Sequence, residues 1–156
     1  MKREALIFER PETLSATQPT NKDHIRVETK KGIIELHINQ NDRVLVDMGE
    51  PVFEPSRIPF LSETESSSYT LDVNGQTIQI AAASMGNPHL VLDVPELNDE
   101  LVNNLGPALE SHEQFPEKVN VGFMEIVHKR FIKLRVFERG VGETMACGTG
   151  ACAAVA

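Results

Sequence analysis

The sequence predicts an α+β fold that consists mostly of antiparallel strands and contains few helices. Apolar and polar residues alternate between residues 25 and 48, with the two-residue period of half-buried strands. Asn74-Gly75 separates two further strand-like segments, and this dipeptide suits the type I′ turn of a β-hairpin. Apolar residues recur at helical spacing in one internal segment, residues 97–109. Nineteen glycine and proline residues favour turns over long helices.

The first expected elements are three strands of an antiparallel meander, followed by a long connection. The strands are expected at residues 25–28, 33–38 and 43–48, with turns at 30–32 and 39–42. Residues 51–68 are rich in proline and serine, and we expect them to form an exposed loop.

The second half of the chain is expected to contain the hairpin, more strands and the internal helix. The strands are expected at residues 69–73, 76–82, 89–94, 119–127 and 131–138. Asn98 is a suitable N-cap for the helix, because its side chain can accept a hydrogen bond from the first turn. Gly106-Pro107 is expected to interrupt this helix.

Composition excludes several classes of protein. The net charge of −8 argues against a nucleic-acid or anionic-membrane partner, because phosphate binding needs clustered Lys and Arg. No apolar run is long enough for a membrane-spanning helix, and the apolar stretch near Met1 is too short for a signal peptide. Two cysteines five residues apart give no disulfide framework. We therefore expect a cytoplasmic protein with free thiols.

Residues 138–152 contain the most informative pattern in the chain. Here Cys147 follows a strand and a glycine-rich turn, and it stands at the expected start of a helix. The unpaired N–H groups of Cys147, Gly148, Thr149 and Gly150 form a site for a carboxylate or phosphate. The same position favours a thiolate at Cys147. A free cysteine is more often a small buried side chain, but its glycine-flanked position favours a catalytic role here.

The same segment resembles a known family. Its residues, Glu-Arg-Gly-x-Gly-Glu-Thr-x-Ala-Cys-Gly-Thr-Gly, resemble the second active-site cysteine motif of the diaminopimelate epimerases. Four other blocks of that family are matched in order: Met-Gly-Glu-Pro at 48–51, Ser-Met-Gly-Asn-Pro-His at 84–89, Leu-Gly-Pro-x-Leu-Glu at 105–110 and Phe-Pro-Glu-x-x-Asn-Val-Gly-Phe at 115–123.

The resemblance covers residues 21–156 and implies a lobe in which a curved, mostly antiparallel sheet wraps around a central helix. Residues 1–20 match none of the family's blocks. The chain is therefore expected to carry most of the second, C-terminal lobe. The first catalytic lobe, with its own cysteine, and the C-terminal end are expected to be absent. The central helix would begin near Cys147 and be packed on all sides.

The resemblance implies an isomerase that interconverts LL- and meso-diaminopimelate in lysine biosynthesis. It uses two thiols for proton transfer and neither a metal nor an organic cofactor. Cys147 matches one of these thiols. Cys152 cannot be the other, because five helical residues turn through about 500° and point its side chain about 140° away from Cys147. The family further implies a homodimer of the full-length protein. A chain without the first lobe is expected to be inactive.

The family's roles can be carried over to further residues. The resemblance makes Asn87 a substrate contact and places His89 close to the reacting centre. Asn120 corresponds to a substrate-binding position. Glu138 would bind or orient the substrate's ammonium group, and Arg139 would hold a carboxylate, for which a guanidinium is well suited. Taken without the family, these five residues are ordinary turn or strand-end polar residues. The N–H groups of Gly148 and Thr149 complete the expected substrate-binding set.

Three other hypotheses remain open from the sequence. One is a one-base isomerase of the same fold that uses Cys147 alone. Another is a thiol hydrolase with Cys147 as nucleophile and His89 as base, which would form a covalent acyl intermediate. The third is an inactive remnant of a truncated gene. The remaining histidines are expected at the surface: His24, His37, His112 and His128.

Overall fold

The computed structural model describes residues 5–9, 23–29, 32–38 and 43–156, which form two compact units, Met1–Glu50 and Pro51–Ala156. The first unit contains one four-stranded antiparallel sheet with the order β1-β4-β3-β2. Its strands are β1 (Ala5–Glu9), β2 (His24–Thr29), β3 (Gly32–Ile38) and β4 (Arg43–Asp47).

The predicted meander of the first unit is confirmed by the pairing of β2 with β3 and of β3 with β4. Alternation places Ile25, Leu36 and Val46 on one face of this sheet, and Val46 is buried. Both predicted turns lie largely outside the described residues. The prediction that residues 21–156 form one lobe stays a prediction.

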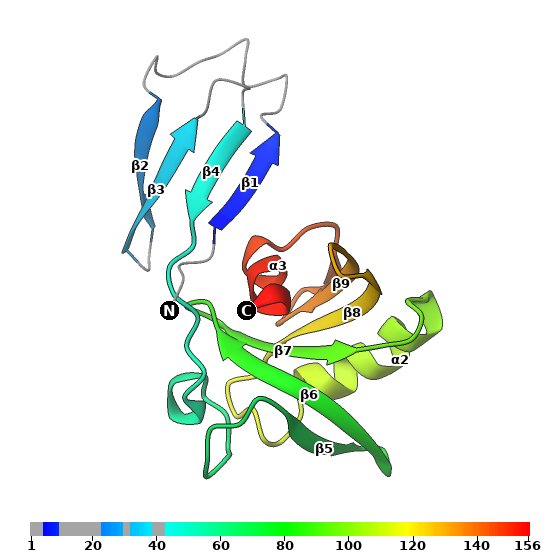
Figure 1. Ribbon diagram of the computed structural model, residues 1–156. Coiled ribbons are helices and arrows are strands. Elements are labelled where there is room, and N and C mark those ends of the chain that lie inside the picture. The colour runs from blue at the N-terminus through cyan, green and yellow to red at the C-terminus, as the bar shows by residue number, and fades with distance from the viewer. Residues whose placement is uncertain (1–4, 10–22, 30–31, 39–42) are drawn as a thin grey trace. The chain divides into compact units, whose positions relative to one another are not determined.

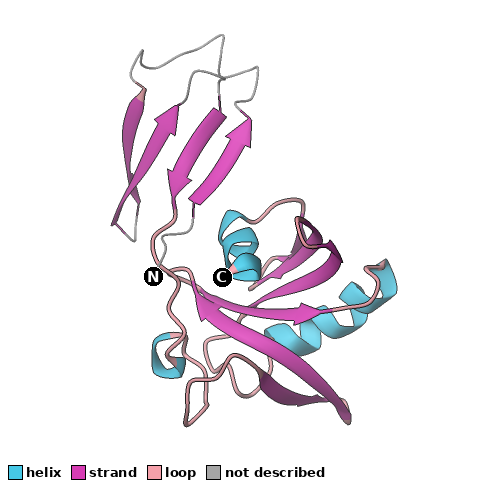
Figure 2. Cartoon of the chain, viewed as in Figure 1, coloured by secondary structure: helices cyan, strands magenta, loops and turns pink. Residues whose placement is uncertain are grey.

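The second unit is built on a six-stranded mixed sheet with the order β10-β9-β8-β7-β6-β5 (Figures 1 and 2). Its strands are β5 (Tyr69–Val73), β6 (Gln76–Ser84), β7 (Pro88–Asp93), β8 (Asn120–His128), β9 (Phe131–Glu138) and β10 (Gly142–Thr144). The helical elements are η1 (Pro55–Arg57), α2 (Asp99–Glu110) and α3 (Gly148–Val155).

The β5–β6 hairpin forms as the sequence predicts. Asn74 and Gly75 have positive φ angles of 55° and 78°, as a type I′ turn requires. All neighbouring pairs of this sheet are antiparallel except β7 and β8, which run parallel. Because a parallel pair needs a crossover, α2 connects β7 to β8. The α+β class with a mostly antiparallel sheet is therefore confirmed.

The core of the second unit lies between the sheet and α2. Leu90 of β7, Val121 and Phe123 of β8, and Val102 and Leu109 of α2 are all fully buried there. Asn98 caps α2 as predicted, because its Oδ1 accepts a hydrogen bond from the N–H of Leu101 at 2.8 Å.

Two local predictions are wrong. The predicted interruption does not occur, because α2 continues through Pro107 to Glu110. Gly106 lies against the ring of Phe137, where an added Cβ would come within 2.7 Å of a ring carbon. The 51–68 connection is not exposed throughout, because Ile58 and Phe60 belong to the core.

Helix α3 packs against the other face of the sheet, over β7, β8 and β9 (Figure 1). Gly150, Cys152 and Ala153 form its buried side, whereas Val155 is 61 % exposed. The sheet of the second unit therefore covers one side of this helix, and the expectation that the helix is packed on all sides stays a prediction.

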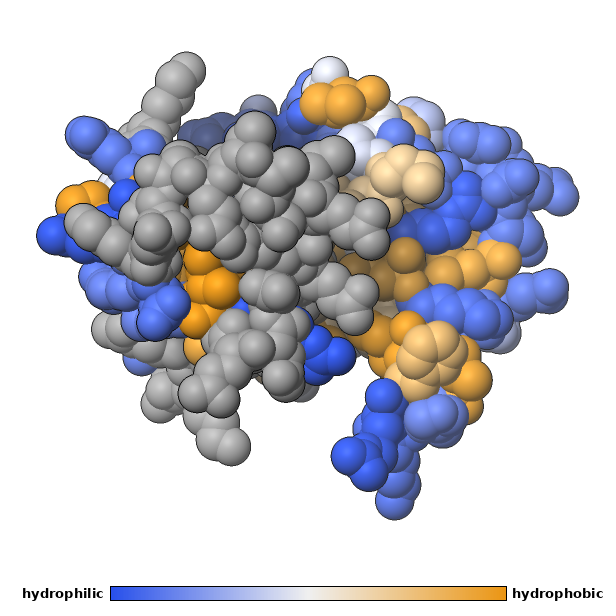
Figure 3. Space-filling model, turned by 90° about the horizontal axis from the view of Figure 1, so that it is seen from above, coloured by the Kyte–Doolittle hydropathy of each residue, from blue (hydrophilic) through white to orange (hydrophobic). Residues whose placement is uncertain are grey.

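Hydrophilic and hydrophobic residues are interspersed over the coloured surface of the space-filling view (Figure 3). Two of the exposed apolar side chains, Val141 and Met145, flank β10. None of the helices in the described part of the chain has the length and apolar composition needed to cross a bilayer.

Candidate functional site

Three strand ends and one helix start place the predicted site residues at one edge of the second unit. Strands β7 and β8 run parallel, so they begin at the same edge, and the antiparallel β9 ends there. His89 and Asn120 are paired residues near the starts of β7 and β8. Glu138 is the last residue of β9, on the same face of that strand as Val136. That face packs against α3, because Val136 lies next to Gly150.

Cys147 is the N-cap residue of α3, as the sequence predicts. It has an extended backbone (φ −136°, ψ 106°), and its side chain caps none of the first N–H groups of the helix. The thiol is half-buried. A Cβ at Gly150 would lie 3.3 Å from its Sγ and 3.0 Å from Val136. Because residue 150 is glycine, the Cys147 thiol and the Val136 side chain of β9 can both lie close to the first turn of α3.

A chain of hydrogen bonds links four predicted site residues. His89 Nε2 lies 3.3 Å from Asn87 Oδ1. The Asn87 amide Nδ2 donates to Thr149 Oγ1 at 3.4 Å, and Thr149 Oγ1 lies 3.5 Å from Cys147 Sγ. Residues 62 positions apart in the sequence are thus joined around the start of α3.

The donor is assigned for the contact between Asn87 and Thr149, whereas either atom can donate in the contact between Thr149 Oγ1 and Cys147 Sγ. The Asn87 amide nitrogen donates to Thr149, so the amide oxygen is the acceptor and His89 Nε2 carries the donated proton. Thr149 Oγ1 already accepts one hydrogen bond, and its own hydroxyl proton can be donated to Cys147 Sγ.

Asn120 and Arg139 are linked to each other and to the strand ends. Asn120 is buried; its Nδ2 donates to Pro88 O at 2.9 Å, and its Oδ1 accepts from the backbone N–H of Arg139 at 3.0 Å. The guanidinium of Arg139 donates to Glu117 O at 2.8 Å. Asn120 therefore holds the start of β7 and the end of β9 together.

The turn after β9 is held by Glu110, which the sequence analysis did not single out. This residue lies in the last turn of α2, and its side chain is only 11 % exposed. Its Oε1 accepts from the backbone N–H of Gly140 at 2.7 Å and from Lys118 Nζ at 3.4 Å. Glu110 thus fixes the turn that follows Glu138 and Arg139. The signal in the sequence that could have identified Glu110 was its position as the last residue of the Leu-Gly-Pro-x-Leu-Glu block.

Strand β10, which leads to Cys147, is fixed by two polar contacts. Thr144 Oγ1 donates to Glu138 Oε1 at 2.5 Å. Arg135 forms two hydrogen bonds with Glu143, at 2.5 and 2.7 Å, and a third with Asp99 in the first turn of α2. The hydrogen bonds from Arg135 lower the pKa of the Glu143 carboxyl group below its usual value. Glu143 therefore anchors β10 to β9 and indirectly to α2.

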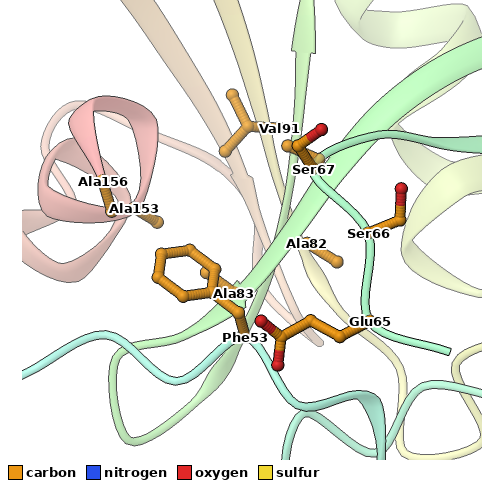
Figure 4. A pocket seen from close by; sticks show the side chains of 10 residues that line it. Phe53, Glu65, Ser66, Ser67, Ala82, Ala83, Val91, Ala153 and Ala156 are labelled. Atoms are coloured by element: carbon orange, nitrogen blue, oxygen red, sulfur yellow. The ribbon is translucent and has the colours of Figure 1, made fainter.

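Cys152 lies on the buried side of α3 and is 2 % exposed, which confirms the prediction that it is structural. A pocket of about 430 Å³ lies near this end of the helix, between α3, β6, β7 and the 51–68 connection. Phe53, Ala83, Val91 and Ala153 line it (Figure 4). It lies away from the Cys147 cluster, because Ala153 is about 9 Å farther along the helix than Cys147.

The second unit is thus an α+β domain that presents a thiol at a helix start, beside the hydrogen-bonded His89, Asn87 and Thr149. A profile of the family described as diaminopimelate epimerase matches residues 81–156. Curated relatives named diaminopimelate epimerase are 56% identical over 135 residues in Pseudomonas syringae pv. tomato and 57% identical over 136 residues in Nitrosomonas europaea. These matches cover 86% and 87% of this chain and 49% and 50% of the relatives.

The chain belongs to the diaminopimelate epimerase family. It spans about half the length of the curated relatives that it matches.

Proposed function

We propose that this chain supplies one catalytic half of a diaminopimelate epimerase, with Cys147 as one of its two proton-transferring thiols. The observation that carries the proposal is the position of Cys147 at the N-cap of α3, at the end of the hydrogen-bonded chain from His89. The similarity to curated diaminopimelate epimerases supports the substrate, LL- or meso-diaminopimelate.

The reaction inverts an α-carbon, so one base must remove the proton and an acid must deliver another from the opposite face. As a thiolate, Cys147 takes the α-proton and becomes a thiol, and in the reverse direction the thiol returns it. The other thiol delivers a proton to the opposite face. Cys152 is not that group, because it is buried on the sheet side of α3. The second thiol therefore belongs to the other half of the full-length enzyme.

The groups around Cys147 suit an amino acid with charged ends. The N–H groups of Gly148 and Thr149, in the first turn of α3, bind a substrate carboxylate and stabilise the negative charge that develops at the α-carbon. Arg139 holds a carboxylate and Glu138 the ammonium group. Asn87 contacts the substrate and keeps His89 and Thr149 aligned beside the sulfur.

Asn120 acts together with Arg139 in this proposal. Its side chain holds the backbone of Arg139 at the end of β9, beside the substrate. For Asn120 to bind the substrate directly, its amide must give up its hydrogen bond to Pro88 O or to the Arg139 N–H and form one to the substrate instead.

The site is open in this chain, since the flanking Val141 and Met145 side chains are 74% and 104% exposed. We propose that the first lobe of the full-length enzyme covers them and excludes water from the substrate. The chain alone then has no epimerase activity. Assembly of the full-length protein as a homodimer and its action in lysine biosynthesis in the cytoplasm belong to the same proposal.

A chimera tests the proposed function. Residues 21–156 replace the segment that they match in the Nitrosomonas europaea relative, and the product is incubated with LL-diaminopimelate in D2O. The proposal predicts meso-diaminopimelate with deuterium at the inverted α-carbon. A folded chimera without turnover would favour the remnant hypothesis. Deuterium exchange without inversion would favour a one-base isomerase, and an acyl adduct on Cys147 would favour a thiol hydrolase.

A further inference from the structure

Two histidines and a glutamate lie together on one face of the first unit, outside the Cys147 cluster. His24 of β2 and His37 of β3 are directly opposite each other in the antiparallel register. Glu35 lies two residues before His37 on the same strand, so its side chain is on the same face. All three side chains are exposed. The strand pairing itself therefore brings two imidazoles and a carboxylate together.

The geometry of this cluster suits a small ion. The two imidazole rings are stacked, with centroids 4.4 Å apart and planes 11° apart. One potential ligand atom from each residue lies within 4.8 Å of the other two. Ligand atoms bound to the same tetrahedral zinc ion are about 3.4 Å apart, as follows from bond lengths near 2.1 Å. Small side-chain rotations close the difference, and cross-strand neighbours have short Cβ separations that permit them.

We propose that His24, Glu35 and His37 form a binding site for a divalent transition-metal ion, with two imidazole nitrogens and one carboxylate oxygen as protein ligands. Imidazole favours zinc, copper and nickel over magnesium and calcium, and the remaining coordination position is open to water. The bound ion links β2 to β3 at the surface of the sheet. This site is independent of the proposed epimerase function.

A metal ion at this cluster must compete with the existing ionic contacts of Glu35. Glu35 Oε2 lies 3.5 Å from His24 Nε2, and Glu35 Oε1 lies 3.8 Å from Arg26 Nε. When the metal ion binds, it takes the place of the direct contact between His24 Nε2 and Glu35 Oε2. Glu35 Oε1 stays beside Arg26. The guanidinium compensates the carboxylate charge and weakens the site, so removal of Arg26 strengthens it.

Isothermal titration calorimetry with zinc sulfate tests the site in the 156-residue chain. The parent carries Cys147→Ser, because the half-buried Cys147 thiol could also bind zinc. We expect one ion per chain, about tenfold or more weaker binding in His24→Ala and His37→Ala, and a smaller loss in Glu35→Gln. His128→Ala is the matched control, since His128 is also an exposed strand histidine but belongs to the second unit. Its affinity should equal that of the parent.

NMR of the imidazole groups gives a second measurement, which needs no substitution of His24, Glu35 or His37. Zinc should shift the signals of His24 and His37 together, with saturation at one equivalent, and leave that of His128 in place. The proposal is overturned if the parent chain binds no zinc, if the His24 and His37 variants bind as tightly as the parent, or if His128→Ala loses as much affinity.

Discussion

The two cysteines are expected to react with alkylating agents at very different rates, because only one of them is accessible in the folded chain. Cys147 is half-buried at the N-cap of α3, whereas Cys152 is 2 % exposed on the sheet side of the same helix. Iodoacetamide can therefore reach Cys147 directly. It reaches Cys152 only after the C-terminal half of α3 opens.

The size of the difference follows from what this opening exposes. It transfers the Cys152 and Ala153 side chains to water, at about 0.8 kcal/mol for each buried side-chain atom, and breaks about 1 kcal/mol of hydrogen bonding. The total of about 3 kcal/mol corresponds to a reaction of Cys152 about 100-fold slower than that of Cys147.

Mass spectrometry of peptides from timed iodoacetamide reactions at pH 7.5 measures both rates in one sample. Cys147→Ser, as a control, should leave only the slow reaction, and urea above the unfolding midpoint should make the two rates nearly equal. Equal rates without urea, in a sample shown to be folded by circular dichroism, would refute the structural reasoning.

Substitutions at three positions test the parts that hold the site. Gly150→Ala should slow alkylation of Cys147 and destabilise the chain by about 1 to 3 kcal/mol in urea unfolding, because its Cβ meets the sulfur and β9; unchanged values would contradict the packing. Glu110→Ala should cost about 1 to 3 kcal/mol because the Gly140 N–H loses its acceptor, and Glu110→Gln should cost less; equal losses would argue against this hydrogen bond. Glu143→Gln should cost up to about 1 kcal/mol at pH 7. Since Arg135 lowers the folded-state pKa of Glu143, this stabilisation is present above the unfolded-state pKa and is lost as the pH falls through the folded-state value. Parent and variant should therefore converge in acid, and a constant difference would contradict the assignment.

The local elements of the fold were predictable because short stretches of sequence determine them. Asn74-Gly75 tolerates the positive φ angles of the β5–β6 turn, and Asn98 supplies the capping oxygen of α2. Pro107 misled the prediction, because α2 tolerates the loss of one i→i−4 hydrogen bond at the proline and continues to Glu110. The parallel β7–β8 pair and the three-residue β10 depend on tertiary contacts that no local pattern encodes.

For the site, too, the features set by local sequence were predictable and those set by tertiary contacts were not. The glycine spacing around Cys147 was sufficient to predict a thiol at a helix start, which the structure confirms. The hydrogen bond between Asn87 and Thr149 joins distant segments and was accessible only through the fold. Glu110 was missed because a glutamate at a helix end is ordinarily a solvated residue, and its burial depends on the β9–β10 turn that packs over it.

The central claim is that Cys147 transfers the α-proton, and Cys147→Ser in the chimeric enzyme tests it most directly. The measurement is the rate at which LL-diaminopimelate in D2O is converted to meso-diaminopimelate with deuterium at the inverted α-carbon, with Cys152→Ala as the matched thiol control. We predict that Cys147→Ser lowers this rate by about 100-fold to 10,000-fold with little change in substrate affinity, because a hydroxyl group is a poor base. Cys152→Ala should change it only through stability. Unchanged conversion to meso-diaminopimelate by a folded Cys147→Ser chimera would contradict the account.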